Sequence, residues 1–394
     1  MTAVNKMFDI KTLNKIAPVG LAKLDPAKYA VSDGIEDPDA ILVRSANMHE
    51  YAEGDRLLCV ARAGAGTNNI PIDRFSEKGI VVFNTPGANA QAVKELALCA
   101  LLLSSRDIVG GIDWVRTIAD KGEAIPAIVE KSKSAYAGPE INGKTLGVIG
   151  LGAIGAKIAN DALDLGMKVY GYDPYLSVDA AWNLSANIIH ATDVDTIFAN
   201  CDYITLHIPY MPATRHFINR EALAKMKNGV RIINLARGEL VCDEDMIEAL
   251  DVCRVACYVT DFPNEKLIGV PHVIAIPHLG ASTPESEDNC AVMAARQIAD
   301  YLENGNIVNS VNLPRAVMPR SGDPRICIIH RNVPDMIAKI TGVLSAAGEN
   351  IENMVNAGFK GKPYAYTMID TNALADNTAE LICEIEGVIR VRTI

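Results

Sequence analysis

The sequence lacks an apolar run long enough to cross a membrane. Its longest unbroken apolar stretch, Leu96 to Leu103, is far shorter than the about 20 residues that a membrane helix needs. The N-terminal MTAVNKMFDI also lacks a basic segment followed by a long apolar one, so we expect no signal peptide. These absences predict a protein that has no membrane partner and resides in the cytoplasm.

Runs of basic residues are missing as well. The chain has 37 Lys and Arg against 48 Asp and Glu, which gives a formal net charge of −11. An acidic chain without basic runs is not expected to bind nucleic acid. If its ligand is an anion, a locally basic pocket must overcome the overall negative field.

The nine cysteines show no pattern of paired spacing. Most lie in apolar runs, as Cys59 and Cys99 do, and we interpret them as small buried hydrophobic residues in a reducing compartment. Cys253 and Cys257 form a CxxxC spacing with no second pair nearby. We therefore expect no metal site.

The chain does contain a repeated alternation of short apolar strands and helical segments. Buried strands are expected at 41–43, 57–60 and 80–83, and again at 145–149, 168–172, 203–208, 231–235, 258–260 and 273–276. This alternation predicts an α/β fold with doubly wound parallel sheets. The segment 89–106 is apolar almost all round, so we expect a helix that is buried between domains or subunits.

A GxGxxG run, Gly150 to Gly155, follows the expected strand 145–149 and opens a helical segment. Such a run alone is a weak signal, because glycines are common in ordinary turns. Between a strand and a helix it is typical of dinucleotide binding. There Gly150 permits the tight turn, Gly152 lets the pyrophosphate approach the backbone, and Gly155 allows close helix–strand packing. The helix N-terminus then offers N–H groups to the phosphates.

Asp173 ends the next expected strand, in the sequence Asp173-Pro174-Tyr175. A carboxylate at this place accepts hydrogen bonds from the ribose hydroxyls and repels a 2′-phosphate, and no Arg follows it. The alternative is a plain turn residue at a strand end. Its context favours NAD as the cofactor over NADP.

The domain organisation follows from these elements. A flavodoxin-like substrate-binding domain is expected at 1–94 and 283–318, interrupted by a Rossmann-like NAD-binding domain at 95–282. Residues 304–324, which contain Gly, Asn and three prolines, indicate a linker. Beyond it the pattern is β-α-β-β-α-β, which predicts a small separate domain at 323–394.

Three charged residues follow successive expected strands. Arg237, Glu265 and His278 come after the strands 231–235, 258–260 and 273–276, at the sheet edge where α/β proteins bind ligands. Taken singly, each has an ordinary alternative as an ion-pair partner, an exposed loop acid or a turn histidine. Together they fit the oxidation of a 2-hydroxy acid. His takes the hydroxyl proton, Glu orients the imidazole, and Arg grips the substrate carboxylate in a bidentate fork.

The runs GxGxxG, NLARGELVCDEDMIEAL and IPHLGAST resemble the D-isomer-specific 2-hydroxyacid dehydrogenase family over roughly residues 1 to 320. The resemblance implies that Arg237 binds the substrate and that Glu265 and His278 form the proton relay. It implies further that Asp261 holds the nicotinamide carboxamide and the Ala236 carbonyl holds the ring. Other residues that it places at the cofactor are Ala153, Ile154, His207, Ile208, Pro209 and Gly280. The loop from Asp261 to Glu265 is one residue shorter than the family's usual loop.

Loops in the first third resemble those of family members that act on a phosphorylated acid. The residues that the resemblance places at the substrate are Arg44, Ser45, Arg62, Gly64 and Asn89. A phosphate needs cations in addition to Arg237, and Arg44 and Arg62 both lie at strand ends; the alternative for each is a surface arginine. The function implied is NAD-dependent oxidation of 3-phospho-D-glycerate to 3-phosphohydroxypyruvate, the first step towards L-serine. Lys94 departs from the apolar residue expected in its helix.

The segment 325–394 resembles an ACT domain, a module that binds amino acids at dimer interfaces. The resemblance implies L-serine as an effector, held by His330, Asn332 and Asn350, and a homodimer or homotetramer. Amide and imidazole groups can satisfy both ends of a zwitterion. Asp335 replaces the usual Gly of this motif, and a purely structural dimerisation module is the alternative.

Two further functions stay open at this point. One is a glyoxylate/hydroxypyruvate or other 2-oxo acid reductase of the same fold, against which Arg44, Arg62 and the C-terminal domain argue. The other is a non-catalytic NAD-sensing regulator, which would need docking segments that the sequence does not suggest. Activity on a panel of 2-oxo acids separates all three.

Overall fold

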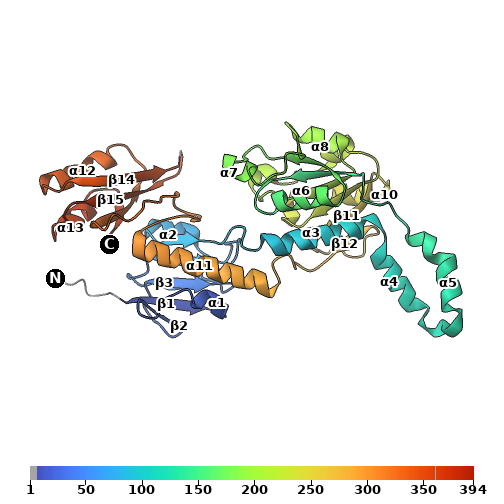
Figure 1. Cartoon of the computed structure of the whole chain (residues 1–394), viewed down its shortest axis with the longest axis horizontal. Coiled ribbons are helices and arrows are strands. Elements are labelled where there is room, and N and C mark those ends of the chain that lie inside the picture. Colours follow the sequence, from blue (N-terminus) through green and yellow to red (C-terminus); the bar gives the residue numbers. More distant parts are fainter. Residues whose placement is uncertain (1–6, 360) are drawn as a thin grey trace. The chain divides into compact units, whose positions relative to one another are not determined.

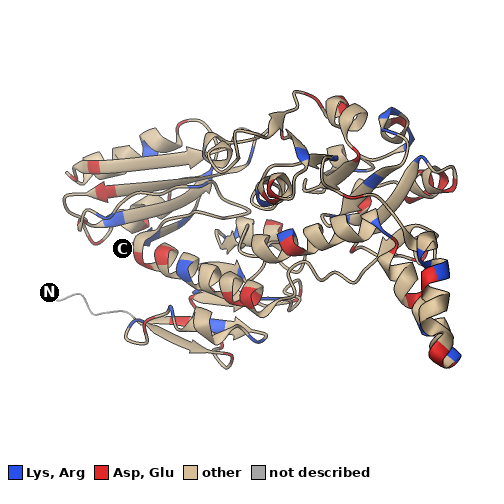
Figure 2. Cartoon of the chain, turned by 45° about the vertical axis from the view of Figure 1, so that its right-hand side comes forward, with Lys and Arg blue, Asp and Glu red and all other residues tan. Residues whose placement is uncertain are grey.

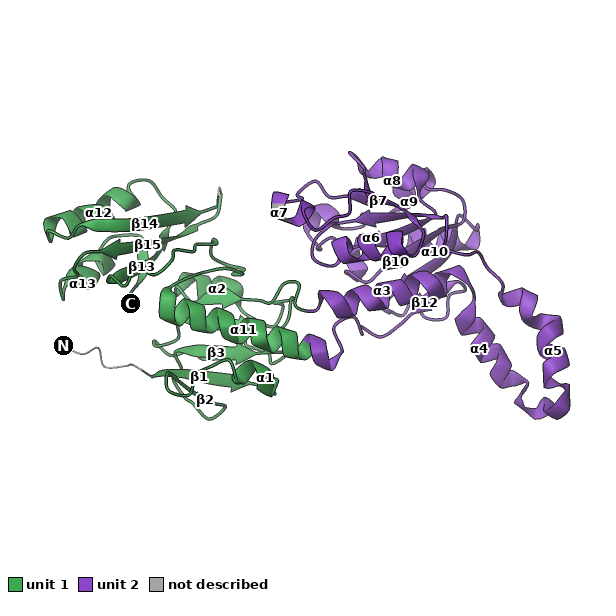
Figure 3. Ribbon diagram, viewed as in Figure 1, with its two compact units in different colours: residues 1–88, 287–394 green, residues 89–286 purple. Residues whose placement is uncertain are grey.

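The computed structural model describes residues 7–359 and 361–394, and the chain divides into two compact units (Figure 3). Unit 1 comprises Met1–Ala88 and Glu287–Ile394, and unit 2 comprises Asn89–Ser286. The chain thus passes between the units after residues 88 and 286, a few residues away from the predicted 94 and 282. Basic and acidic residues are interspersed over both units (Figure 2).

Unit 1 contains a five-stranded parallel sheet, covered by helices that include α1 (Pro18–Leu21), α2 (Ile72–Glu77) and α11 (Pro284–Asn304). Its strands are β1 (Phe8–Leu13), β2 (Tyr29–Ser32), β3 (Ala40–Val43), β4 (Cys59–Arg62) and β5 (Val81–Phe83), in the order β2-β1-β3-β4-β5. This is the flavodoxin-like order, as predicted. β1 and β2 are not among the strands expected from the sequence, because only Ile10 and Tyr29 of these strands are buried and the apolar signal is therefore weak.

Unit 2 contains a seven-stranded parallel sheet of the Rossmann type. Its strands are β6 (Thr145–Ile149), β7 (Lys168–Tyr172), β8 (Ile189–His190), β9 (Tyr203–Leu206), β10 (Val230–Asn234), β11 (Val255–Thr260) and β12 (Val273–Ala275), in the order β12-β11-β10-β9-β6-β7-β8. The strand order turns back between β6 and β9, which is where such sheets bind ligands. Its helices include α3 (Ala90–Ser105), α6 (Gly155–Asp164), α7 (Val178–Ala181), α8 (Val194–Asn200), α9 (Arg220–Lys225) and α10 (Asp243–Asp251). The prediction of two doubly wound sheets is confirmed.

A helical arm leaves the body of unit 2 between α3 and β6 (Figure 1). It consists of α4 (Ile108–Thr117), η1 (Ala119–Ala124), α5 (Ile125–Ser132) and η2 (Lys133–Tyr136). The rings of Trp114 and Tyr136 hold the arm together, with centroids 5.4 Å apart. None of the four elements has a buried residue, although α4 exposes several large apolar side chains. The arm is not among the elements expected from the sequence.

The C-terminal segment of unit 1 has the predicted β-α-β-β-α-β order. Its elements are β13 (Arg325–Arg331), α12 (Met336–Ala346), β14 (Ile351–Gly358), β15 (Tyr364–Thr371), α13 (Thr378–Cys383) and β16 (Val388–Thr393). The strands form an antiparallel sheet in the order β14-β15-β13-β16. We call residues 325–394 the C-terminal module.

The C-terminal module is packed on both faces of its sheet. One face, with Ile328 and Ile369, forms a core with α12 and α13. The other face, with Ile329 and Tyr366, belongs to the same buried cluster as Tyr301 of α11. The module is therefore integrated into unit 1 and not a separate domain, because it shares a hydrophobic core with the rest of that unit.

The expected linker is also part of this core. Ile307 and Leu313 expose 0% and 2% of their surface, and Ala316 and Met318 are buried as well. Backbone pairs join Ile307 to Ala316 and Ser310 to Phe83. The composition of this Pro- and Gly-containing segment favours turns and so predicts a linker, but its apolar residues anchor it in the core.

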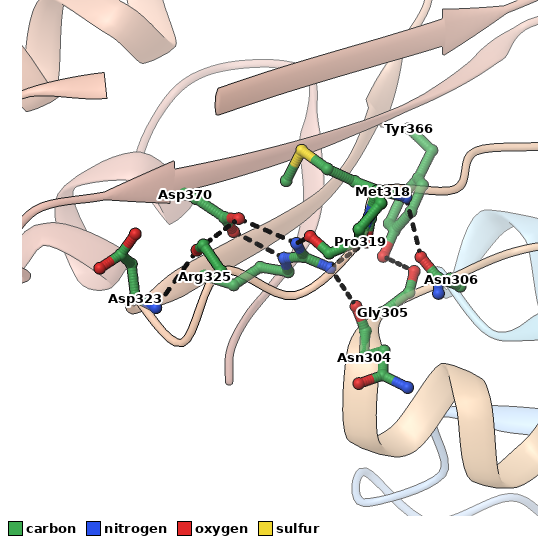
Figure 4. A network of polar contacts seen from close by, with 10 residues as sticks. Asn304, Gly305, Asn306, Met318, Pro319, Asp323, Arg325, Tyr366 and Asp370 are labelled. Carbon is green, nitrogen blue, oxygen red and sulfur yellow. Dashed lines mark hydrogen bonds and ion pairs between the residues drawn. The ribbon is translucent and has the colours of Figure 1, made fainter. Parts of the chain in front are cut away.

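A buried arginine joins the C-terminal module to the end of α11 (Figure 4). Arg325 is fully buried, and its Nε and Nη2 donate to the two oxygens of Asp370 at 2.6 and 2.9 Å. Its remaining N–H groups donate to the carbonyls of Asn304, Met318 and Pro319 at 2.7 to 2.8 Å. All five donors of the guanidinium are thus satisfied. Burial alone would raise the pKa of Asp370, but the bonds from Arg325 lower it, so the pair stays ionised.

The module also caps the C-terminus of α11. Helices end with carbonyl groups that have no partner inside the helix and attract cations, and α11 has no basic residue in its last turn. Arg392 of β16 donates to the carbonyls of Leu302, at 3.0 Å, and Tyr301, and its guanidinium lies 4.4 Å from the Tyr301 ring centroid. Together with Arg325, it supplies the cations that α11 itself lacks.

Candidate active site

The glycine fingerprint has the geometry that dinucleotide binding requires. Gly150 has a φ of +92°, and a Cβ there would lie 2.6 Å from the His207 carbonyl oxygen. A Cβ at Gly155 would lie 1.9 Å from the Gly150 oxygen, so helix α6 packs directly against the turn. At Gly152 a Cβ would meet no protein atom. The space over Gly152 is therefore open, as a pyrophosphate requires, and Ala153 and Ile154 complete the turn to α6.

Asp173 holds this turn from the end of β7. Its carboxylate accepts hydrogen bonds from the backbone N–H groups of Leu151 and Tyr175, both at 2.9 Å. The carboxylate is thus fixed beside the fingerprint, and carboxylate oxygens retain lone pairs for ribose hydroxyls. This arrangement fits the ribose-binding role inferred from the sequence.

The turn after β9 lies against the same loop. The ring Nε2 of His207 pairs with Thr205 Oγ1 at 2.8 Å, and burial lowers the pKa of His207 to about 3. The imidazole is therefore neutral at neutral pH. Ile208 comes within 3.0 Å of a Cβ at Gly150, so the turn His207–Ile208–Pro209 forms an uncharged wall next to the fingerprint.

Arg237 and Ala236 lie on the turn after β10. Arg237 is exposed, and its Nη1 donates to the Ala236 carbonyl at 2.6 Å. The turn is held by the buried side chain of Asn234, which the sequence analysis did not single out. The only sequence signal for Asn234 was its place at the end of a buried strand.

Asp261 has a carboxylate that lacks a partner. It is 1% exposed, and neither oxygen accepts a hydrogen bond from any described residue. Burial, the largest effect, raises the pKa of Asp261, and the charges of His278 and Arg237 offset only part of this rise. A buried acceptor without a donor is costly, so an amide N–H of a ligand would be stabilised here. The residues thus fit the carboxamide of a nicotinamide. Gly280 contributes to the same place, since a Cβ there would lie 3.7 Å from Asp261 Oδ2.

His278 is held by Phe262. The two rings meet edge to face, with centroids 4.7 Å apart, while His278 itself stays exposed. An exposed imidazole with a restrained ring direction is suited to exchange a proton with a bound substrate.

Glu265 does not reach His278 in this structure. Glu265 is exposed, and no hydrogen bond or ion pair joins it to His278 within residues 7–359 and 361–394. The side chain of Asn264 instead closes the short loop, because its Oδ1 accepts from the N–H groups of Lys266 and Leu267. Catalytic hydrogen bonds are often long before ligands bind, so the relay remains a prediction.

The expected substrate residues fall in both units. Arg44, Ser45, Arg62 and Gly64 belong to unit 1, whereas Asn89 and Arg237 belong to unit 2. Arg62 is the register partner of Val43, so the two arginines end neighbouring strands, and Arg62 Nε donates to the Arg44 carbonyl at 3.0 Å. Arg44 forms an ion pair of 2.6 Å with Glu287. Ser45 donates its N–H to Asn14.

Lys94, unexpected in an apolar helix, has a partner on the cofactor helix. Its Nζ lies 2.6 Å from Asp161 Oδ2, and its side chain is 14% exposed. The pair ties α3 to α6, which explains the charge.

The three expected effector residues do not meet within one chain. His330 is buried and its ring nitrogens pair with Arg331 O and Thr367 Oγ1. The register pairs His330 with Ala365 and Ile351 with Thr371. Asn350 therefore lies about 20 Å from His330 along the strands, at roughly 3.3 Å per residue.

Asn332 lies against Gly358, the last residue of β14. Asp335, which follows on the same loop, has a φ of 73°. This is the left-handed region in which Asp is tolerated better than most residues. The loop thus keeps a glycine-like conformation without glycine.

A model of the "D-isomer specific 2-hydroxyacid dehydrogenase, NAD binding domain" matches residues 90–280. A D-3-phosphoglycerate dehydrogenase of Synechocystis sp. is 31% identical, over 92% of this chain and 70% of its own length. The chain belongs to the D-isomer specific 2-hydroxyacid dehydrogenase family. Its seven-stranded unit is the family's NAD-binding domain.

The relatives of this chain include proteins named for different activities. A hydroxypyruvate reductase of Thermotoga maritima is 38% identical, over 67% of this chain and 85% of its own length. The structure of an NAD+-bound 3-phosphoglycerate dehydrogenase of Entamoeba histolytica is 26% identical and aligns with a TM-score of 0.61, over 78% of this chain and 99% of that chain. The chain spans 59% to 70% of the length of the first curated phosphoglycerate dehydrogenases it matches.

Proposed function

We propose that the chain oxidises 3-phospho-D-glycerate to 3-phosphohydroxypyruvate with NAD, the first step towards L-serine. The observation that carries this proposal is the pair Arg44 and Arg62 at the ends of neighbouring strands in unit 1. Two guanidinium groups at the ligand-binding edge of a sheet suit a phosphate dianion. An unphosphorylated 2-hydroxy acid needs only Arg237 for its carboxylate.

The residues of unit 2 divide the chemistry among them. Bound NAD would accept the hydride from C2 of the substrate. Arg237 would hold the substrate carboxylate, and His278 would take the proton of the C2 hydroxyl. Asp261 and the Ala236 carbonyl would accept hydrogen bonds from the carboxamide and so orient the nicotinamide ring. Glu265 would join His278 only if its loop moves when ligands bind.

The extent of similarity favours this function over a 2-oxo acid reductase. A match over 92% of the chain must include most of residues 325–394. The Thermotoga maritima reductase matches over 67%. Matches over 84% to 92% of this chain are with phosphoglycerate dehydrogenases, although others of that name match over 78% to 79%.

The test is a substrate panel with Arg44→Ala. The protein should reduce 3-phosphohydroxypyruvate with NADH far more efficiently than hydroxypyruvate. Arg44→Ala should raise KM for the phosphorylated substrate about tenfold or more, which corresponds to one lost charge-assisted bond. KM for hydroxypyruvate should change little, and added salt should reduce the difference because half-exposed charges are screened.

Arg56 offers a matched control. Its side chain is 44% exposed, compared with 43% for Arg44, and it is likewise paired with a carboxylate, Asp39. Asp39 precedes β3, so Arg56 lies at the opposite edge of the sheet. Arg56→Ala should leave both KM values unchanged. Equal losses on both substrates in Arg44→Ala would show that Arg44 is structural, and a better rate with hydroxypyruvate in the unchanged protein would favour the reductase.

We also infer that the protein assembles as a homodimer, or as a homotetramer built from dimers, through the arm of unit 2. Ile108, Ile112 and Val115 are 39% to 49% exposed and share one face of α4 at helical spacing. An apolar stripe on a projecting arm is typical of a surface that is covered in an oligomer.

The described cysteines are all free, in keeping with a cytoplasmic enzyme.

L-serine is the effector that we propose for the C-terminal module, bound between two copies. β14 is an edge strand, and its last residue, Gly358, lies beside Asn332. If two β14 strands paired antiparallel, Asn350 of one copy would lie near Asn332 and His330 of the other. A site completed in this way does not need the three residues to meet in one chain.

Calorimetry with L-serine tests this site on the intact protein. Binding should be saturable, lower the activity, and disappear in Asn332→Ala and Asn350→Ala. The matched control is Asn377→Ala, since Asn377 is exposed at the start of α13 and makes no side-chain cap. A coupling of about 1–3 kcal/mol would give 5- to 150-fold effects. Absence of binding at millimolar serine would leave the module with a structural role only.

A further inference from the structure

Two buried polar residues end neighbouring strands directly beneath the candidate active site. Asn234 is the last residue of β10 and Thr260 the last of β11, and the register pairs them with each other. Both are 0% exposed. Polar side chains in such places are retained only when their hydrogen bonds are satisfied, so their partners indicate what they do.

Asn234 uses its entire hydrogen-bonding capacity. Its Oδ1 accepts from the N–H groups of Ala236 and Arg237, at 3.2 and 3.4 Å. Its Nδ2 donates to the Arg237 carbonyl at 2.8 Å and to the Tyr258 hydroxyl at 3.3 Å. An amide side chain can form four such bonds. Three of these four hydrogen bonds stabilise the turn that carries Arg237. The fourth joins the amide to Tyr258 of the neighbouring strand β11.

Thr260 does the same for the neighbouring turn. Its Oγ1 accepts from the N–H of Phe262 at 3.1 Å, and the Phe262 ring restrains His278. The two turns also touch, because a Cβ on Gly238 would lie 3.2 Å from the Phe262 Cβ. The direction of Arg237 and the setting of His278 therefore both depend on side chains at strand ends.

We propose that Asn234 is a positioning residue of the dehydrogenase, held in orientation by the Tyr258 hydroxyl. It aims the Arg237 guanidinium and the Ala236 carbonyl, and it does so from beneath the site without touching either ligand. This role rests on the proposed function only in so far as Arg237 binds the substrate carboxylate. It holds for any 2-hydroxy acid that the protein accepts.

The hydroxyl of Tyr258 is the part of this network that can be removed most cleanly. Tyr258 is 1% exposed on β11, and burial raises its pKa to about 12, so it is a neutral phenol. Tyr258→Phe would leave one N–H of Asn234 without an acceptor and keep the packing of the ring. Small displacements of a positioned group have large kinetic effects, up to about 100-fold for 1 Å.

The experiment compares two tyrosines of the same sheet. Tyr203 of β9 is 0% exposed, and its hydroxyl bonds to Ser105 Oγ at 2.9 Å, at the start of its strand and away from the ligand edge. Tyr203→Phe and Tyr258→Phe each remove a hydroxyl that is hydrogen-bonded inside the protein. Both should lower the unfolding midpoint by a similar 2–4 °C, roughly. Only Tyr258→Phe should raise KM for the 2-hydroxy acid, by about tenfold, with a smaller change in kcat.

A second variant tests whether the kinetic loss increases with the number of Asn234 hydrogen bonds removed. Asn234→Asp keeps the acceptor oxygen for Ala236 and Arg237 but loses both donated bonds, so kcat/KM should fall further, by about 100-fold. If Tyr258→Phe and Tyr203→Phe have the same KM, or if Asn234→Asp is no worse than Tyr203→Phe, Asn234 has no positioning role. The assay uses whichever 2-hydroxy acid the unchanged protein turns over. Failure of the proposed substrate therefore shows in the unchanged protein and is distinct from failure of the positioning role.

Discussion

His278→Asn should lower turnover about 10²- to 10⁴-fold, the usual contribution of a general base. Asparagine retains a polar side chain of similar length but cannot take the hydroxyl proton. The edge-to-face ring contact with Phe262 is lost, but the glycine fingerprint and Asp173 are unchanged, so NADH affinity measured by fluorescence titration should change little. Steady-state turnover at saturating substrate is the measurement that separates loss of chemistry from loss of binding.

The matched control is His272→Asn. His272 is exposed and precedes β12 at the opposite end of that strand. Its φ of 65° is one that asparagine accepts. The control should retain full turnover. Near-normal turnover in His278→Asn would remove His278 from the mechanism. Glu265→Gln should shift the pH profile if the relay forms on ligand binding, and an unchanged profile would show that it does not.

Arg325→Met should lower the free energy of unfolding of unit 1 by about 3–5 kcal/mol, the usual loss when one partner of a buried ion pair is removed. The substitution leaves the Asp370 carboxylate buried and unpaired, and it leaves three backbone carbonyls without a donor. Denaturant unfolding measures the loss. Because Arg325 also donates to the Asn304 carbonyl at the end of α11, protease cleavage within residues 305–324 should also become faster.

An exposed ion pair serves as the control for Arg325. Arg220 and Glu248 are 68% and 56% exposed on the surface of unit 2, so Arg220→Ala should cost far less stability than Arg325→Met. A loss in Arg325→Met no larger than that of the control would mean that the module is not held by this residue. The same reasoning predicts that a chain ending near Pro319 is unstable, because removal of the C-terminal module uncaps α11 and exposes Tyr301.

The strand ends explain why so much of the site was predictable. Arg237 and His278 each follow a short, strongly apolar strand, of which β10 is buried and β12 is only partly buried, and parallel strands bring their carboxyl ends to one edge. The glycine fingerprint is recognisable because its run lies within a single strand–turn–helix unit, although the contact that excludes a side chain at Gly150 comes from His207 on the turn after β9. Asn234 and Tyr258 escaped notice because a polar residue inside an apolar run has no periodic signal. Its role depends on which strand lies next to it.

The local hydrophobic pattern of the sequence was least informative for segments whose burial depends on packing against other elements. The segment 304–324 has the composition of a linker, and only the shared core around Tyr301 and Ile307 shows that it is anchored. The arm at 108–136 carries an apolar stripe on α4 at helical spacing, and only the tertiary structure shows that this stripe is exposed. β1 and β2 carry too few buried residues to register as strands.

The sequence by itself determined the two doubly wound sheets, the NAD fingerprint, the βαββαβ order and the charged residues at the strand ends. Each of these depends on residues close together in the chain, and local physical chemistry is sufficient for them. Only the tertiary structure decided that Arg325 and Arg392 dock the C-terminal module on α11, that Lys94 pairs with Asp161, and that Glu265 stands apart from His278. The docking contacts and the Lys94 pair join residues that are far apart in the chain. The position of Glu265 depends on the path of a loop that is one residue short, and no local pattern encodes either.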